Sequence, residues 1–327
     1  MKHISILIPE GNTSLTNIEA CYKMFSMVND GLAMAGKPAI FSVKLVGLNA
    51  ETSAGNGLFS VKPEYTITDN FKTDLIIIPA VHGDIGEVLE RNKSFVPWII
   101  QQYKNGSEVV SLCIGAFILA ATGLLDGKSC TTHWLMAEEF RNMYPEVNLM
   151  PHKIITDEHG IYTSGGAYSS LNLLLYLIEK FAGKDMALRS SKIFEIDVDR
   201  DSQSPFIMFA GQKSHEDEAI KQAQDFIEKN FSDKISIEQL AGLIAVGRRS
   251  FERRFKKATC NTVTEYIQRV KMEAAKKSFE TSRKNINEVM YEVGYTDSKA
   301  FRTVFKNITG LSPVNYRNRY NKEMAVA

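Results

Sequence analysis

The sequence predicts two domains of different class: an α/β domain built on a parallel sheet, followed by an all-helical domain. Over residues 1–185, short apolar runs alternate with longer helix-like segments, and this alternation is typical of strands covered by helices. Charge divides the chain at a similar place. Residues 232–320 hold 18 Lys and Arg against 9 Asp and Glu, although the net charge of the chain is only +1. A basic segment of this kind suggests a polyanionic partner, but a merely solvated basic face is a common alternative, so charge alone is weak evidence.

The sequence of the first domain predicts five strands and five helices. The expected strands are residues 4–8, 41–48, 74–79, 108–112 and 160–166. The expected helices are residues 14–36, 85–106, 116–125, 131–144 and 169–183. Parallel strands end at a common edge of the sheet, and ligands bind there. We therefore expect the loop at residues 79–84, Cys113 and residues 163–168 to meet at that edge.

The stretch EVVSLCIGAFILAATGLL, residues 108–125, places Cys113 on the turn between a buried strand and a helix. A small residue at Gly115 allows a tight turn, which is the mechanics of a nucleophile elbow. A helix N-terminus would favour the thiolate at such a turn. The alternative is a buried cysteine that packs as a small apolar side chain, and the local pattern leaves both interpretations open.

Composition restricts the class of protein. The four cysteines form no CxxC pair and no Cys/His cluster of zinc spacing, so we expect no disulfide framework, metal or cofactor. The N-terminus is an expected strand without a signal-peptide cleavage site, and no apolar run has the length of a membrane span. These features predict a reduced, cytoplasmic protein without a membrane partner.

A connection between the domains is expected at residues 186–216. This segment mixes alternating charge with Ser, Gln and Pro, including the sequence SQSPF at residues 202–206. An additional strand pair of the first domain is the alternative.

The helical domain is predicted to begin with two short helices packed on each other, within residues 236–259. Ser236 and Gln239 fit a capping box, and the chain turns near residues 245–247. The second helix buries Phe251 and Phe255 and exposes polar side chains at its other face, as a helix-turn-helix recognition helix does. The exposed side chains are Arg248, Arg249, Glu252, Arg253, Lys256 and Lys257.

The arrangement repeats over residues 285–310, and residues 262–280 suit a long helix that links the two copies. Two recognition helices held in this way can enter consecutive major-groove segments about 34 Å apart. A chance basic amphipathic helix explains one such unit, but it explains two poorly.

Residues 1–185 resemble the PfpI/ThiJ-type members of the class I glutamine amidotransferase-like superfamily. The resemblance rests on VVSLCIGAFILAATGLLDGKSCTTHW and GIYTSGGAYSSLNLLLYLIEKFAG, and it implies a flavodoxin-like parallel sheet. In catalytic members, a carboxylate from the loop after the first strand contacts the cysteine. Thr16 occupies that position here, while Glu10 lies elsewhere in the loop. Members with a catalytic histidine carry it directly after the cysteine, and isonitrile-hydrating members carry threonine there; this chain has Ile114.

These departures predict an elbow that keeps its shape but not its chemistry. A thiol without a charged or basic neighbour has little reason to lower its pKa. His133, 20 residues after Cys113, is the alternative activating group. We expect a ligand pocket in which the amides of Gly83 and Ile114 can receive a polar group. The expected pocket residues are Thr16, His82, Gly83, Cys113, Ile114 and His133.

Residues 217–320, with a tail at 321–327, resemble the AraC family of transcription regulators. The matching stretches are FERRFKKAT, EYIQRVKMEAAKKSFE and VGYTDSKAFRTVFKNITGLSPVNYR. In two small departures, Cys260 replaces the usual glycine and Lys271 a common arginine. The resemblance places base-facing side chains at Arg249, Glu252 and Arg253, and at Ser298, Lys299, Arg302 and Thr303.

Together the two halves resemble AraC-type regulators whose sensor is an amidotransferase-like domain. The resemblance implies a sequence-specific transcription regulator that binds double-stranded DNA as a homodimer, with RNA polymerase as a further partner. A small-molecule effector or dimerisation would control it. Two alternatives remain: a cysteine-dependent hydrolase or hydratase fused to a DNA-binding module, and a purely structural dimerisation domain. Thr16 and Ile114 argue against the enzyme.

Overall fold

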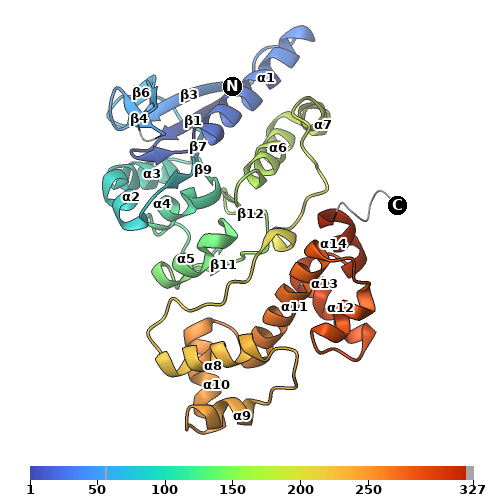
Figure 1. Cartoon of the computed structure of the whole chain (residues 1–327). Helices are drawn as coiled ribbons and strands as arrows, with labels where there is room; N and C mark the ends of the chain where they lie inside the picture. The colour runs from blue at the N-terminus through green and yellow to red at the C-terminus, as the bar shows by residue number, and fades with distance from the viewer. Residues whose placement is uncertain (56, 322–327) are drawn as a thin grey trace. The chain divides into compact units, whose positions relative to one another are not determined.

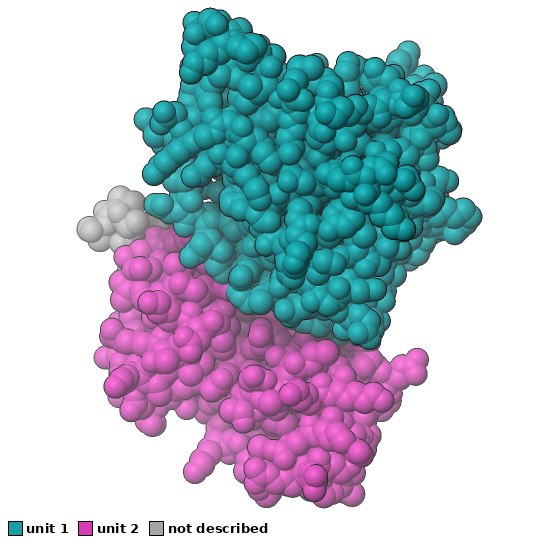
Figure 2. Space-filling view, turned by 180° about the vertical axis from the view of Figure 1, so that it is seen from behind, with its two compact units in different colours: residues 1–203 teal, residues 204–327 magenta. Residues whose placement is uncertain are grey.

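A computed structural model describes residues 1–55 and 57–321. The chain forms two compact units, residues 1–203 and residues 204–327 (Figure 2). Their elements are labelled in Figure 1.

The first unit is built on a seven-stranded sheet with the order β12-β13-β9-β7-β1-β3-β6. All neighbouring strands are parallel except β12 and β13, which are antiparallel. The predicted α/β class with a parallel sheet is therefore confirmed. The strands are β1 (Lys2–Ile8), β3 (Phe41–Gly47), β6 (Tyr65–Thr66), β7 (Leu75–Ile78), β9 (Glu108–Ser111), β12 (Ile155–Glu158) and β13 (Ile161–Ser164).

Helices cover both faces of this sheet because its strands are apolar on both sides. Along β1, Leu7 packs in one core, whereas Ile6 and Ile8 pack in the other. The Leu7 core contains residues of α2 (Ile85–Asn92), α3 (Phe95–Lys104), α4 (Ala116–Ala120) and α5 (Ala137–Met143). The opposite core contains residues of α1 (Leu15–Met34), α6 (Ser169–Ala182) and α7 (Lys184–Ile193). Short pairs complete the unit: β2 (Asn12–Thr13) with β8 (Val81–His82), β4 (Thr52–Ala54) with β5 (Phe59–Val61), and β10 (Ser129–Cys130) with β11 (Asn148–Leu149).

Three expected helices differ from those observed. The segment 85–106 is two helices, because Pro97 has no N–H and its ring would clash with the carbonyl of Lys93 in a continuous helix. The segment 116–125 is helical only as far as Ala120, since Gly123 adopts φ 72°. The segment 131–144 starts with an extended His133 and a 3₁₀ turn (Trp134–Met136) before α5.

The expected connection at residues 186–216 also differs from the observed structure. Residues 186–193 belong to α7, which is packed against α6. Gln203 is 1% exposed, and its side chain accepts from the Gly166 amide at 2.8 Å and donates to the Thr132 carbonyl at 2.9 Å. The next residues belong to the second unit, where the Tyr320 hydroxyl donates to the Pro205 carbonyl at 3.2 Å. The change from one unit to the other thus falls within SQSPF.

The second unit is helical and internally repeated (Figure 1). Its first core includes Phe251 and Phe255, and its second core includes Phe301 and Phe305. The long α11 contributes to both cores, as expected for a linking helix. The helices are α8 (Glu218–Lys229), α9 (Ile237–Leu243), α10 (Arg248–Thr259), α11 (Val263–Thr281), α12 (Ile286–Glu292), α13 (Ser298–Thr309) and α14 (Pro313–Tyr320).

Candidate functional site

Cys113 lies on a strained turn directly after β9. Its φ is 55°, a left-handed value that is uncommon for a residue with a side chain. Gly115 makes the turn possible, because a Cβ there would lie 2.5 Å from the Ile78 carbonyl oxygen. The elbow geometry predicted from the sequence is therefore present.

The surroundings of Cys113 disfavour its thiolate. The residue is only 4% exposed, and burial raises the pKa of its thiol. Backbone hydrogen bonds from Ala167 and Ile114 act in the opposite direction but do not outweigh burial. The backbone is also fixed, since the Cys113 amide donates to Ser164 Oγ at 3.2 Å and its carbonyl accepts from Thr132 Oγ1 at 2.9 Å. A thiol held in this way lacks the lowered pKa of a nucleophile.

A cavity of about 270 Å³ opens beside Cys113, at the carboxyl edge of the sheet. It brings together the loop after β7, the elbow and the start of α6, as the sequence predicted. Of the expected pocket residues, Thr16, His82, Cys113 and His133 line it, whereas Gly83 and Ile114 are not among its lining residues. Ala80, Ala167 and Tyr168 also line it and lie in the two loops that the sequence placed at this edge. The sequence did not single out the other lining residues, which are Ser14, Asn17, Ser170 and Leu171.

Glu10 is not a lining residue of this cavity. Its carboxylate accepts hydrogen bonds from Asn49 Nδ2 at 2.9 Å and from Thr52 Oγ1 at 3.2 Å. Thr16 lines the cavity instead, and it is the residue that the sequence placed at the position of the carboxylate in catalytic members. The loop after β1 therefore brings no carboxylate to Cys113.

His133 is held in one orientation at the cavity wall. Its Nδ1 accepts a hydrogen bond from the Leu135 amide at 3.1 Å. Burial, followed by the neighbouring charge of His82, lowers the pKa of His133. The free protein thus favours a neutral His133 imidazole, and because Nδ1 accepts, its proton is on Nε2.

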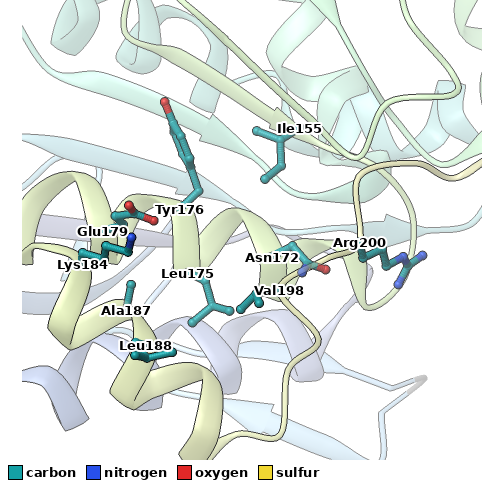
Figure 3. A pocket seen from close by; sticks show the side chains of 10 residues that line it. All are labelled: Ile155, Asn172, Leu175, Tyr176, Glu179, Lys184, Ala187, Leu188, Val198 and Arg200. Carbon is teal, nitrogen blue, oxygen red and sulfur yellow. The ribbon is translucent and has the colours of Figure 1, made fainter.

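A second cavity of the first unit, of about 300 Å³, lies along α6 and α7. Leu175, Leu188 and Val198 give it an apolar character, with Arg200 at one end and Lys184 at the other (Figure 3). None of the residues singled out in the sequence lines this cavity.

The candidate nucleic-acid interface begins with α10, whose two faces differ strongly. Phe251 and Phe255 are fully buried on one face, and all the cationic side chains of α10 except Arg254 are exposed. Arg248 is bonded to Glu238 Oε1 at 2.5 Å and lies 3.7 Å from Glu252 Oε2. The expected recognition side chains Arg249, Arg253 and Lys256 are exposed, and Glu252 is half-buried.

Arg254 is the basic residue of α10 that does not belong to this face. Its guanidinium makes two hydrogen bonds to the carboxylate of Asp217, the N-cap residue of α8, at 2.7 and 3.0 Å. This pair lowers the pKa of the Asp217 carboxyl. Arg254 therefore fastens α10 to α8.

The second candidate recognition helix, α13, has fewer charges. Lys299, Arg302 and Thr303 are exposed, whereas Ser298 is half-buried. Lys306 is also exposed in the last turn, although it was not among the expected base-facing side chains. Its spacing of four residues from Arg302 is the signal that identifies it, because residues four apart share one helix face.

Among residues 1–55 and 57–321, no helix combines the length and the apolar character that a membrane span requires. In the same residues, no three or more His, Cys, Asp or Glu side chains are grouped so that they could hold a metal ion.

Comparisons with known proteins agree with this division into two parts. Residues 5–180 match the DJ-1/PfpI family, and residues 240–319 match a helix-turn-helix domain. The HTH-type transcriptional regulator GbdR of Pseudomonas aeruginosa is 23% identical over 72% of this chain, which covers 65% of GbdR. Isonitrile hydratase of Pseudomonas putida is 30% identical over 39% of this chain and 54% of its own length.

Similarity to a solved structure supports the fold. An AraC family transcriptional regulator from Pseudomonas putida is 14% identical, with a TM-score of 0.50 over 59% of this chain and 100% of that chain. The two family matches confirm the resemblance inferred from the sequence. The chain belongs to the DJ-1/PfpI family and combines that domain with an AraC-type helix-turn-helix domain.

Proposed function

We propose that this protein is a sequence-specific DNA-binding transcription regulator. The observation that carries the proposal is the duplication of the helix-turn-helix unit, with exposed cationic side chains on both α10 and α13. Each recognition helix has a buried phenylalanine pair behind it, so the exposed face is free to contact base edges and phosphates. The named regulator GbdR, which covers most of this chain, supports the same function.

The first unit is proposed to carry the control of DNA binding. A small-molecule effector would bind in the Cys113 cavity, which opens at the sheet edge where α/β domains bind ligands. Formation of a homodimer would strengthen DNA binding through effective concentration, and RNA polymerase would be a further partner.

Division of labour between the units gives a direct test. Residues 204–327, expressed alone, should bind double-stranded DNA with an affinity that falls steeply with salt concentration, because phosphate contacts release counterions. Residues 1–203 alone should not bind DNA. Fluorescence anisotropy on both fragments and the full chain measures this, and DNA binding by residues 1–203 would contradict the assignment.

A cysteine-dependent hydrolase or hydratase is the second candidate function. The strained elbow at Cys113 and the partial similarity to isonitrile hydratase favour it. The raised pKa of the Cys113 thiol, Thr16 and Ile114 oppose it. Alkylation of Cys113 at increasing pH, followed by mass spectrometry, should give a midpoint no lower than that of free cysteine. A lower midpoint, together with isonitrile turnover lost in Cys113→Ser, would establish the enzyme.

A further inference from the structure

Gln203 is the last residue of the first unit, and its side chain is buried there. Its Oε1 accepts from the Gly166 amide at 2.8 Å. Its Nε2 lies 2.9 to 3.0 Å from three carbonyl oxygens, which belong to Thr132, Pro151 and Lys153. We call these four bonded groups the Gln203 seat. The seat fits a carboxamide, because it offers a donor to the oxygen and only acceptors to the nitrogen.

Both ends of this carboxamide are one residue away from the lining of the Cys113 cavity. At one end, Gly166 precedes Ala167, which lines the cavity. At the other end, Thr132 precedes His133, which also lines it. The two ends are packed together, since a Cβ at Gly166 would lie 2.1 Å from His133 Cδ2. A movement of either lining residue therefore reaches the carboxamide.

The backbone is strained where the cavity meets the Gln203 seat. Ala167 has φ 49° and Cys113 has φ 55°, and such left-handed values are costly for residues with a side chain. Thr132 Oγ1 donates to the Cys113 carbonyl at 2.9 Å, so the elbow and the seat share a residue. Strained backbone persists only while surrounding contacts hold it. An occupant of the cavity that replaces these contacts lets the backbone relax.

The chain is held again directly after Gln203, within the second unit. The Pro205 carbonyl accepts from the Tyr320 hydroxyl at 3.2 Å. The Ile207 carbonyl accepts from Nζ of Lys276, a buried residue of α11, at 2.5 Å. A single residue separates Gln203 from Pro205, so this connection has little slack. Release of Gln203 therefore changes how the chain enters the DNA-binding unit.

We propose that Gln203 couples the Cys113 cavity to the DNA-binding unit. An occupant of the cavity moves Ala167 or His133, opens the Gln203 seat and frees the chain that enters the second unit. This proposal rests on the proposed effector role of the cavity, and it names the residue through which the effector acts.

Two variants open the seat from opposite sides. Gln203→Glu is nearly isosteric, but its carboxylate would face the carbonyl oxygens that now surround Nε2. Gly165→Ala introduces a Cβ 2.4 Å from Gln203 Cδ, so the flexible glutamine side chain must move. The φ of Gly165 lies outside the left-handed region, so alanine fits its backbone. Thermal melts that match the parent protein show that both variants keep the fold.

A covalent probe that occupies the cavity tests the proposal on the full-length protein. Iodoacetamide places a carbamidomethyl group on the Cys113 thiolate, with loss of iodide. The parent protein for this test carries Cys260→Gly, which removes the exposed cysteine of the helical unit. Cys21 and Cys130 are completely buried, so the probe is directed to Cys113. Mass spectrometry of the intact protein shows when modification is complete.

Hydrogen exchange then reports the seat directly. The Gly166 amide donates to Gln203 Oε1, and the Gln203 amide donates to the His152 carbonyl at 2.7 Å. Modification of Cys113 should speed exchange at both amides on the order of tenfold, because lost hydrogen bonds contribute about that factor. In Gln203→Glu, exchange should be fast already, and modification should add little. Unchanged exchange in the modified parent, or an equal further acceleration in the variant, would overturn the proposal.

DNA affinity separates coupling from a merely structural role of Gln203. Modification of Cys113 should change the affinity of the parent for DNA selected from a random library several-fold, and Gln203→Glu should lose this response. A flexible Gly/Ser insertion directly after Gln203 keeps the seat but adds slack. It should retain the exchange response and lose the DNA response.

An unchanged affinity of the modified parent, or a response that survives the insertion, would overturn the coupling. Sequence-specific binding by the unmodified parent reports the regulator function separately. Failure of the regulator function and failure of the coupling through Gln203 can therefore be distinguished.

Discussion

The two helix-turn-helix units have nearly the same framework but different outer faces. Phe251, Phe255 and Thr259 of the first helix-turn-helix motif have counterparts 50 residues later in the second motif, and all six side chains are buried. Both threonines donate from Oγ1 to the carbonyl four residues earlier, at 2.8 Å. By contrast, α10 has six basic residues and one acidic residue, whereas α13 has three basic residues and no acidic one. The buried positions define the motif, and the exposed positions are free to differ in what they contact.

The turns and ends of the two units differ as well. The turn before α10 has Ala245 at φ 52°, whereas the turn before α13 has Gly294 at φ 74°. A Cβ at Gly294 would lie 1.9 Å from the Ser232 carbonyl oxygen and 2.8 Å from Lys271 Nζ. Lys271 is buried there and donates to the Val293 carbonyl at 3.0 Å. The second turn is thus closely packed and requires glycine.

The largest expected effect tests the shared framework. Phe255→Ala and Phe305→Ala should each lower the free energy of unfolding of their own core by about 3 to 5 kcal/mol, because each removes a fully buried ring. Hydrogen exchange followed by mass spectrometry should show faster exchange chiefly in the helix-turn-helix motif that carries the change. Equal acceleration in both motifs would mean that the two motifs unfold together.

The next effect tests the difference between the turns. Gly294→Ala should destabilise the protein by roughly 2 kcal/mol or more, because the new Cβ meets backbone at a positive φ. Ala245→Gly, its matched control, should change stability by less than about 1 kcal/mol. Chemical denaturation compares the two variants. A Gly294→Ala protein as stable as the parent would show that the second turn can relax.

DNA binding tests the difference between the outer faces. Arg253→Ala should weaken specific binding by about 1 to 3 kcal/mol and relax the preference at the bases that Arg253 reads, if it makes a base contact. Arg302→Ala should do the same at a separate part of the site. Gel-shift titrations with matched and mismatched DNA measure both. Uniform weakening on all sequences would assign the side chain to a phosphate.

The smallest expected effect is that of Cys260→Gly, at the C-terminal end of the first recognition helix. Cys260 ends α10 at φ 56°, where α13 has Gly310 at φ 75°. Cys260→Gly should change stability by under about 1 kcal/mol, because relief of the left-handed strain is offset by the greater entropy of the unfolded chain. Gly310→Cys should be clearly destabilising. Thermal melts of both variants give the comparison, and similar losses in both would contradict it.

Periodicity predicted the sheet and the repeated motif, because each depends on local spacing of apolar residues. The division of the expected helix 85–106 into two helices was indicated locally by Pro97. The long apolar pattern on both sides of Pro97 favoured one continuous helix instead. The hydrogen bonds of Gln203 to Gly166 and of Arg254 to Asp217 could not be predicted from local sequence, because each pair is 37 residues apart in the chain. The cavity lining was predicted at Thr16, His82, Cys113 and His133, which lie in motifs or loops at the expected edge of the sheet. Ser14 and Ser170 reach it through the packing of α1 and α6.

The most direct test of the regulator function is selection of DNA by the full-length protein. A random double-stranded library should yield one enriched sequence, with two half-sites about one helical turn apart, as two linked recognition helices require. The double variant Arg253→Ala/Arg302→Ala should lose that enrichment while keeping weak, salt-sensitive binding. Failure of the parent protein to enrich any sequence, or the same enrichment by the double variant, would contradict the account.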